Sequence, residues 1–364
     1  MRLSVDACAA AIPLALAAWS VSSSTLHHLD LRVSVENLPD IIPPTLVFPH
    51  LSHLTVELRI VYRSSDAMAH ILGTLLPFLN RSSPTLTSFA LLTREHLPLK
   101  ELYTKLSVMP KLRSFVAMQG YVSTLQTDTS GLHDFLSRHS DTLHSLSLSF
   151  YSLGSGIILD PEMEGWTEQE FLRVSLPNLT SLTLGLYDFP AHFGEKIRKS
   201  LQGLSIPELR HLYLPMPLPL LELEEIFQDG MDIQVLTLNC TSIEAALFDL
   251  VASKLPRLLH LDLRYAAGRD NHAQQSQEDQ MRLETLIKQH VSDIQGTCTE
   301  ALTLTAFHNQ DQLAPSDTPK HPLRTIYLGI KSPKKANIEA LRAQLTIGWF
   351  PSLQVLAGEE AALL

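Results

Sequence analysis

Residues 176–190 read LPNLTSLTLGLYDFP, in which Leu179, Leu182 and Leu184 occupy the frame L-x-x-L-x-L. The alternation of apolar and polar residues over 182–184 is the period-two pattern of a short strand with one buried face. Pro177 stands just before the first leucine of the frame. Proline is tolerated where a strand begins but not in its interior, so it marks the end of the preceding segment. The stretch therefore predicts one short strand.

The same frame recurs along the whole chain. Twelve copies begin at residues 26, 51, 86, 112, 143, 179, 209, 233, 258, 299, 323 and 353. Their spacing averages about 30 residues, close to the range of leucine-rich repeats. The intervening segments have apolar residues at helical spacing, as in 243–256. This alternation predicts an α/β solenoid, a horseshoe of about twelve irregular repeats with parallel strands on the concave face and helices on the convex face.

The copies resemble leucine-rich repeats (LRRs) of the irregular, ribonuclease-inhibitor-like kind, and in particular the LRR part of fungal F-box/LRR proteins, which also read PxLxxLxL. The resemblance covers about residues 24–360. It implies a non-enzymatic scaffold for protein–protein interaction, as the substrate-recognition part of an F-box-type ubiquitin-ligase subunit. An F-box would precede such repeats, but no helical segment with an LPxE-like start stands before residue 24. A cullin-adaptor protein is thus an expected partner only if an F-box is supplied upstream.

We expect two regions in the chain. Residues 1–23 form an N-terminal apolar capping segment, or alternatively a secretory signal peptide, because an apolar run follows Met1-Arg2. Residues 24–364 form the LRR domain, with long insertions near 152–166, 264–280 and 308–322. Sequons at Asn80, Asn178 and Asn239 fit the alternative function, a secreted or cell-surface LRR binding protein.

Composition narrows the classes of partner and compartment. The net charge is −10, and no basic run is longer than Lys334-Lys335. We therefore expect neither nucleic acid nor an anionic membrane surface as a partner, since both need clustered Lys and Arg. The three cysteines, Cys8, Cys240 and Cys298, form no CxxC pair. A reducing compartment, cytoplasm or nucleus, is the simpler expectation.

Candidate binding residues lie between the inward leucines of each strand and would face the concave side. Those with charged, aromatic or imidazole side chains are His28, Asp30, Arg32, His53, Glu57, His211, Tyr213, His260, Asp262, Arg264 and Tyr327. Aromatic and Arg side chains dominate the energetics of many protein interfaces, so we predict a protein-binding surface there. Trp166, within the insertion 152–166, is predicted to be a loop anchor for a partner.

No catalytic, cofactor or metal site is predicted, and we expect no enzyme. The four histidines at equivalent positions (28, 53, 211 and 260) include only one adjacent pair, His28 and His53, and that pair has no third ligand at fixed spacing. Ser145, Ser147 and Ser149 lie near His144, but no GxSxG elbow accompanies them. P-loop, dinucleotide-binding and HExxH motifs do not occur.

Overall fold

The computed structural model describes residues 1–7, 12–60, 66–95, 97–121, 129–152, 169–187, 194–227, 231–240, 245–265, 325–329 and 355–358. The chain divides into two compact units, Met1–Met216 (unit 1) and Pro217–Leu364 (unit 2). Each unit is a run of strands that follow one another in chain order.

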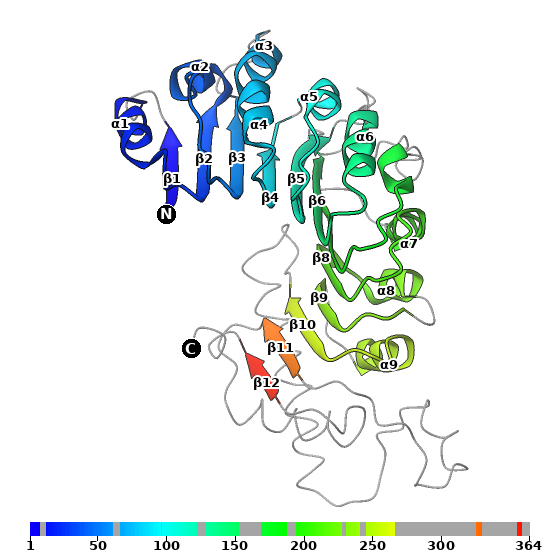
Figure 1. Cartoon of the computed structure of the whole chain (residues 1–364). Helices are drawn as coiled ribbons and strands as arrows, with labels where there is room; N and C mark the ends of the chain where they lie inside the picture. The colour runs from blue at the N-terminus through cyan, green and yellow to red at the C-terminus, as the bar shows by residue number, and fades with distance from the viewer. Residues whose placement is uncertain are drawn as a thin grey trace, which may run out of the picture. The chain divides into compact units, whose positions relative to one another are not determined.

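Unit 1 is built on parallel strands, each hydrogen-bonded to the next. These are β1 (Arg2–Ala7), β2 (His28–Ser34), β3 (His53–Arg59), β4 (Ser88–Thr93), β5 (Ser114–Tyr121), β6 (Ser145–Ser152), β7 (Ser181–Tyr187) and β8 (His211–Leu218), which ends just beyond the unit boundary. The helical segments are α1 (Ile12–Ser22), η2 (Val35–Asn37), α2 (Leu38–Ile41), α3 (Ala67–His70), η3 (Ile71–Leu75), α4 (Leu76–Ser82), α5 (Lys100–Lys105), α6 (Ser130–Arg138), η6 (Glu170–Arg173) and α7 (Gly194–Gly203). The helices of unit 1 lie on one face of its sheet (Figure 1).

The leucine frame builds the core between sheet and helices. The pairing register aligns Leu29, Leu54, Phe89, Phe115, Leu146, Leu182 and Leu212 in one row. All of these side chains are at most 1% exposed. Because side chains alternate between the two faces of a strand, the residues between the apolar ones point away from the helices. The prediction of an α/β leucine-rich-repeat fold is confirmed.

The repeat frame locates most strands correctly. Eleven of the predicted copies coincide with strands, and the copy at 299 lies outside the described residues. At the N-terminus the structure shows more than a cap: residues 2–7 form β1, which pairs in parallel with β2. Helix α1 follows, and Trp19 anchors it, donating its indole N–H to Ile41 O at 2.8 Å and packing edge-on against Phe48.

Side chains link successive repeats through backbone groups. The hydroxyls of Ser52, Thr87 and Thr180 each donate to a carbonyl of the preceding repeat, at 3.0–3.2 Å. Asn80, a sequon asparagine, donates to Lys105 O at 3.3 Å and accepts from Ser107 N at 2.8 Å. These bonds provide partners for backbone N–H and C=O groups in the loops, which would otherwise have to bond to water. They also fix the spacing between neighbouring repeats.

His139 is a buried polar link of the same kind. Its Nε2 accepts the amide N–H of Met109 at 2.9 Å, so Nδ1 carries the proton and donates to Phe135 O at 2.7 Å. Desolvation by burial lowers the pKa of His139. The hydrogen bond to Phe135 O acts in the opposite direction, and the charge of the nearby Arg138 lowers the pKa further. The imidazole is therefore neutral, because a proton on Nε2 would face another donor.

Unit 2 continues the same strand pattern. It contains α8 (Leu220–Ile226), β9 (Val235–Cys240), α9 (Ala245–Lys254), β10 (His260–Tyr265), β11 (Thr325–Gly329) and β12 (Val355–Gly358). The strands pair in parallel, β9 with β10, β10 with β11 and β11 with β12. Leu236, Leu238, Leu261 and Leu263 are fully buried. The insertions 152–166, 264–280 and 308–322 fall almost entirely outside the described residues.

The register yields a first prediction. Leu182→Asp places a carboxylate at a position that is 0% exposed and should lower the free energy of unfolding by more than about 3 kcal/mol. Thr183→Asp, one residue further on and pointing to the opposite face, is the matched control and should change stability by less than about 1 kcal/mol. Chemical denaturation of both variants measures this, and equal losses would contradict the assigned register.

Candidate protein-binding face

The face of the unit 1 sheet that is opposite the helices (Figure 1) is called the open face below. Alternate residues of β1–β8 point to it, because side chains alternate between the two faces of a strand. The pairing register arranges them in rows that cross the sheet. One row runs Arg2, His28, His53, Ser88, Ser114, Ser145, Ser181 and His211. The next runs Ser4, Asp30, Thr55, Ala90, Val116, Ser147, Thr183 and Tyr213. Paired strands lie about 4.8 Å apart, so neighbours within a row can touch.

Ion pairs occupy the open face over β1–β3. This charged patch consists of Arg2, Asp6, Asp30, Arg32, Glu57 and Arg59. Arg2 pairs with Asp30 at 3.0 Å and Arg32 with Glu57 at 3.1 Å. Arg59 contacts both Glu57, at 3.2 Å, and Asp6, at 3.6 Å. Exposed pairs of this kind contribute only about 0–1 kcal/mol each, so the patch does little for stability.

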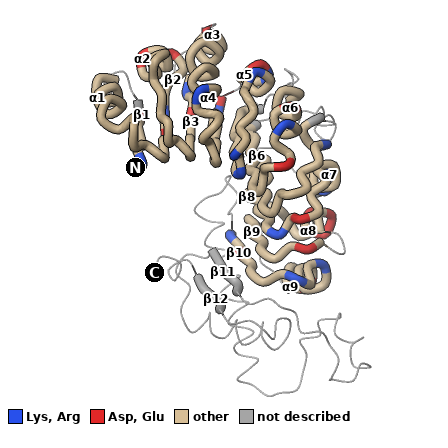
Figure 2. The backbone as a smooth tube through the Cα atoms, in the orientation of Figure 1, with Lys and Arg blue, Asp and Glu red and all other residues tan. Residues whose placement is uncertain are grey.

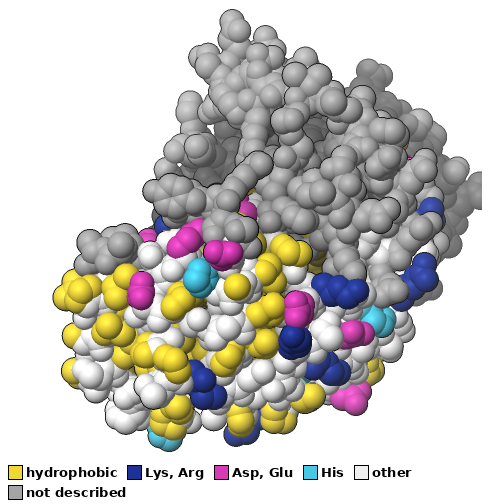
Figure 3. Space-filling view, turned by 90° about the horizontal axis from the view of Figure 1, so that it is seen from above, with side chains coloured by type: hydrophobic (Ala, Val, Ile, Leu, Met, Phe, Trp, Pro, Cys, Tyr) yellow, Lys and Arg dark blue, Asp and Glu magenta, His cyan; other side chains and the backbone are white. Residues whose placement is uncertain are grey.

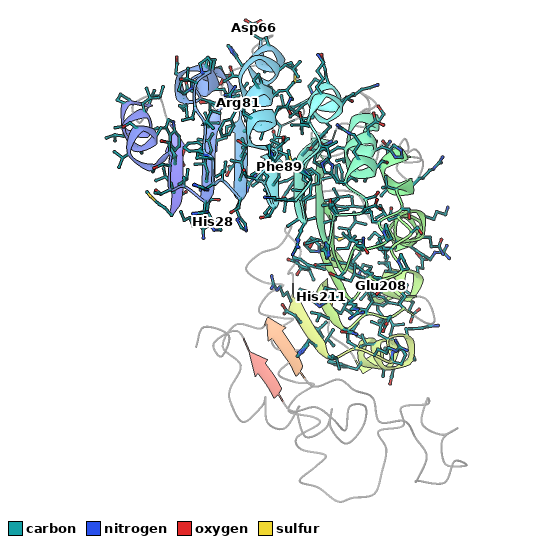
Figure 4. All side chains as sticks on the ribbon, in the orientation of Figure 1. His28, Asp66, Arg81, Phe89, Glu208 and His211 are labelled. Carbon is teal, nitrogen blue, oxygen red and sulfur yellow. The ribbon has the colours of Figure 1, made fainter. Side chains whose placement is uncertain are left out.

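Two histidine pairs lie beside the charged patch. The rings of His28 and His53, which are register partners, stack with centroids 4.0 Å apart, and His28 lies at the start of β2 (Figure 4). The rings of His27 and His50 stack at 5.8 Å. Partial desolvation of its ring lowers the pKa of His53, and the neighbouring His28 imidazole lowers it further. Within the described residues, no group of three or more His, Cys, Asp or Glu side chains could hold a metal ion.

An uncharged zone follows the charged patch. Strands β4 to β8 contain no Lys, Arg, Asp or Glu, and Figure 2 shows charges mainly on the helical side of this part of unit 1. On β4 and β5 the open face carries Ala90, Leu92, Val116 and Met118, called the apolar patch below. The register pairs Ala90 with Val116 and Leu92 with Met118, and the three larger side chains are partly exposed. Leu92 also lies beside Glu57 of the charged patch.

Small hydroxyl side chains border the apolar patch on its other side. Ser145 and Ser147 of β6 lie beside Ser181 and Thr183 of β7, and all four are partly exposed. The imidazole of the nearby His144 hydrogen-bonds through Nδ1 to Thr142 O at 2.8 Å. The open face thus passes from ion pairs through apolar side chains to hydroxyl groups. Together these provide hydrogen-bonding and apolar contacts over a continuous surface.

The predicted binding residues fall into separate groups. The structure brings His28, Asp30, Arg32, His53 and Glu57 together on β2 and β3. His211, which is exposed, and Tyr213, which is half-buried, come from β8.

The remaining predicted binding residues belong to unit 2. His260 is exposed on β10, and Asp262 and Arg264 form an ion pair there at 3.0 Å. The backbone of Tyr327 pairs with Asp262, while its side chain, like Trp166, lies outside what the structure describes.

The predicted list of binding residues does not include the apolar patch. Leu92 follows the inward Leu91 directly, and this break in the apolar–polar alternation is the signal that could have identified it. Val116 and Met118 occupy outward positions, where an apolar side chain serves no purpose in the core.

Two further features concern the buried cysteine and the length of the helices. Cys240 is fully buried, and burial raises the pKa of its thiol to about 12, so this cysteine is an inert core residue. In the part of the chain that the structure describes, no helix combines the length and apolar character needed to cross a bilayer.

Comparison with known proteins does not assign this chain to a family. No protein-family model matches the sequence, and no curated protein matches it. Among solved structures, the chain is similar to one in the crystal structure of the Rad7–Elc1 complex in yeast, with 14% identity over 76% of this chain and 81% of that chain. The TM-score is 0.32. At this level the likeness assigns neither a fold nor a function, and the strand order, register and burial described above define the fold.

The histidine pair predicts a pH dependence of stability. The folded state holds the pKa of His53 below its ordinary value, so in the window between the two values the unfolded chain binds more protons. Stability should therefore fall as the pH is lowered from about 7.5 to about 5.5. His53→Gln should reduce this loss, as measured by thermal unfolding at both pH values. His70→Gln, on α3 and outside the pair, is the control; a loss in His53→Gln equal to that of the wild type would contradict the assignment.

Proposed function

We propose that the open face of unit 1 binds a protein partner, with the apolar patch at the centre of the contact. The single observation that supports this is the partial exposure of Leu92, Val116 and Met118 on a sheet face that no helix among the described residues covers. Inward positions of the same strands are already filled by Phe89, Leu91 and Phe115, so the outward apolar side chains add nothing to the core.

The surroundings of the apolar patch suit a protein rather than a small molecule. Protein interfaces commonly have an apolar centre and a polar rim that remains partly hydrated. Here the charged patch lies on one side, and the serine and threonine side chains of β6 and β7 lie on the other. A partner segment with an apolar centre and polar flanks would match both borders. The hydroxyl groups offer hydrogen bonds without the desolvation cost of a charge.

The finer form of the proposal concerns ubiquitin transfer. We propose that the bound partner is a substrate, and that the chain acts as the recognition part of an F-box-type ubiquitin-ligase subunit. Support comes from the PxLxxLxL form of its repeats and their resemblance to fungal F-box/LRR proteins. A cytoplasmic or nuclear location is part of this proposal.

The test is affinity purification of the tagged full chain from its own organism, followed by mass spectrometry and by binding measurements with each recovered protein. Met118→Asp should weaken a genuine open-face partner at least about tenfold in Kd, equivalent to about 1.4 kcal/mol. Tyr213→Ala should also weaken the partner if its contact extends to β8.

The matched control is Leu221→Asp, which makes the same kind of change at a side chain that is 74% exposed on α8. It should leave the affinity unchanged. Equal binding by the wild type and Met118→Asp would refute the open-face site. Recovery of a cullin-adaptor protein would support the role in ubiquitin transfer. If an open-face partner is recovered repeatedly without such an adaptor, the chain is a binding scaffold with no role in ubiquitin transfer.

A further inference from the structure

Strand β1 has one hydrogen-bonding edge that no described residue pairs with. Met1 O accepts the N–H of His28 at 3.1 Å, so the backbone groups of Met1 face β2. Successive residues of a strand point their N–H and C=O groups in alternate directions. The groups of Leu3 and Val5 therefore also face β2, and those of Arg2, Ser4 and Asp6 face the unpaired edge.

The outward residues of β1 are complementary to a second copy of themselves. In antiparallel pairing centred on Ser4, Ser4 lies opposite Ser4 of the other copy, and Arg2 lies opposite Asp6. These are the residues whose backbone groups face the edge, so each opposite pair can exchange N–H···O bonds. Each cation then also meets a carboxylate. The side chains of Arg2 and Asp6 are 75% and 60% exposed, so both are accessible to such a partner.

Apolar side chains at the same end of unit 1 remain uncovered. Leu3 and Val5 are partly exposed, whereas their register partners Leu29 and Leu31 are 1% exposed. On α1, Leu14 is 74% exposed and Val21 is 82% exposed. Figure 3 shows hydrophobic side chains gathered at the left end of the view, where α1 lies in Figure 1. Such exposure favours association with another apolar surface.

We propose that this end of unit 1 is a homodimer interface, formed by antiparallel pairing of β1 with β1 of a second copy. The two-fold axis passes between the two Ser4 residues, perpendicular to the sheet. This symmetry is isologous and closed, so pairing stops at two copies. It places both α1 helices on the same face of the joined sheet, on either side of the axis. The exposed side chains of α1 and the inward side chains Leu3 and Val5 would then be partly covered.

A proline substitution tests the backbone pairing. The N–H of Ser4 is not needed for pairing with β2, so Ser4→Pro should leave the fold intact, since proline is tolerated on edge strands. It removes both central N–H donors of the dimer. Ser4→Ala retains them and is the matched control. By sedimentation velocity over a wide concentration range, the wild type and Ser4→Ala should dimerise. Ser4→Pro should be monomeric with an unchanged circular dichroism spectrum.

A charge exchange tests the register. Arg2→Asp and Asp6→Arg should each weaken the dimer at least about tenfold in Kd, because like charges then lie opposite each other at both ends of the contact. The double variant restores opposite charges and should restore the dimer. Arg32→Asp, on the same face but one strand away from the edge, should remain dimeric. A wild type that is monomeric at every concentration, or a double variant that stays monomeric while folded, would overturn the proposal; in that case another partner covers the edge.

Discussion

The in-register parallel pairing of successive strands is the constraint on which the rest of the molecule depends. Each frame contributes two alternating inward side chains, such as Leu182 and Leu184, which stack on the same positions of the next strand. A shift of one residue would turn these leucines outward and bury Ser181 and Thr183 instead. The strong preference for buried leucine thus fixes the register, and the register in turn decides which side chains meet on the open face.

Much of the fold could be predicted because the frame is explicit in the sequence. Strand positions followed from the leucines, and their outward neighbours followed from the alternation. Strand β1 was missed because it contributes only Leu3 and Val5, without the leading proline and leucine that mark other copies. The apolar run after it suggested a cap or a signal peptide. In the structure this run is helix α1, which Trp19 ties to the next repeat through Ile41.

The candidate site was less predictable because it is formed between strands. Which residues face outward could be derived from each strand alone. The pairing of Arg59 with Asp6, or of Leu92 with Met118, depends on loops of different lengths bringing strands into one register. The predicted list favoured charged and aromatic residues, and it therefore omitted the apolar patch.

The lack of charged residues in β4–β8 has a consequence for the conditions under which the open face works. Attraction between exposed charges is screened over about 8 Å at physiological ionic strength, and contacts with the charged patch would weaken as salt is added. Burial of Leu92, Val116 and Met118 depends on the removal of apolar surface from water, which salt does not screen. A partner held at the apolar patch would therefore keep its affinity across wide changes in ionic strength.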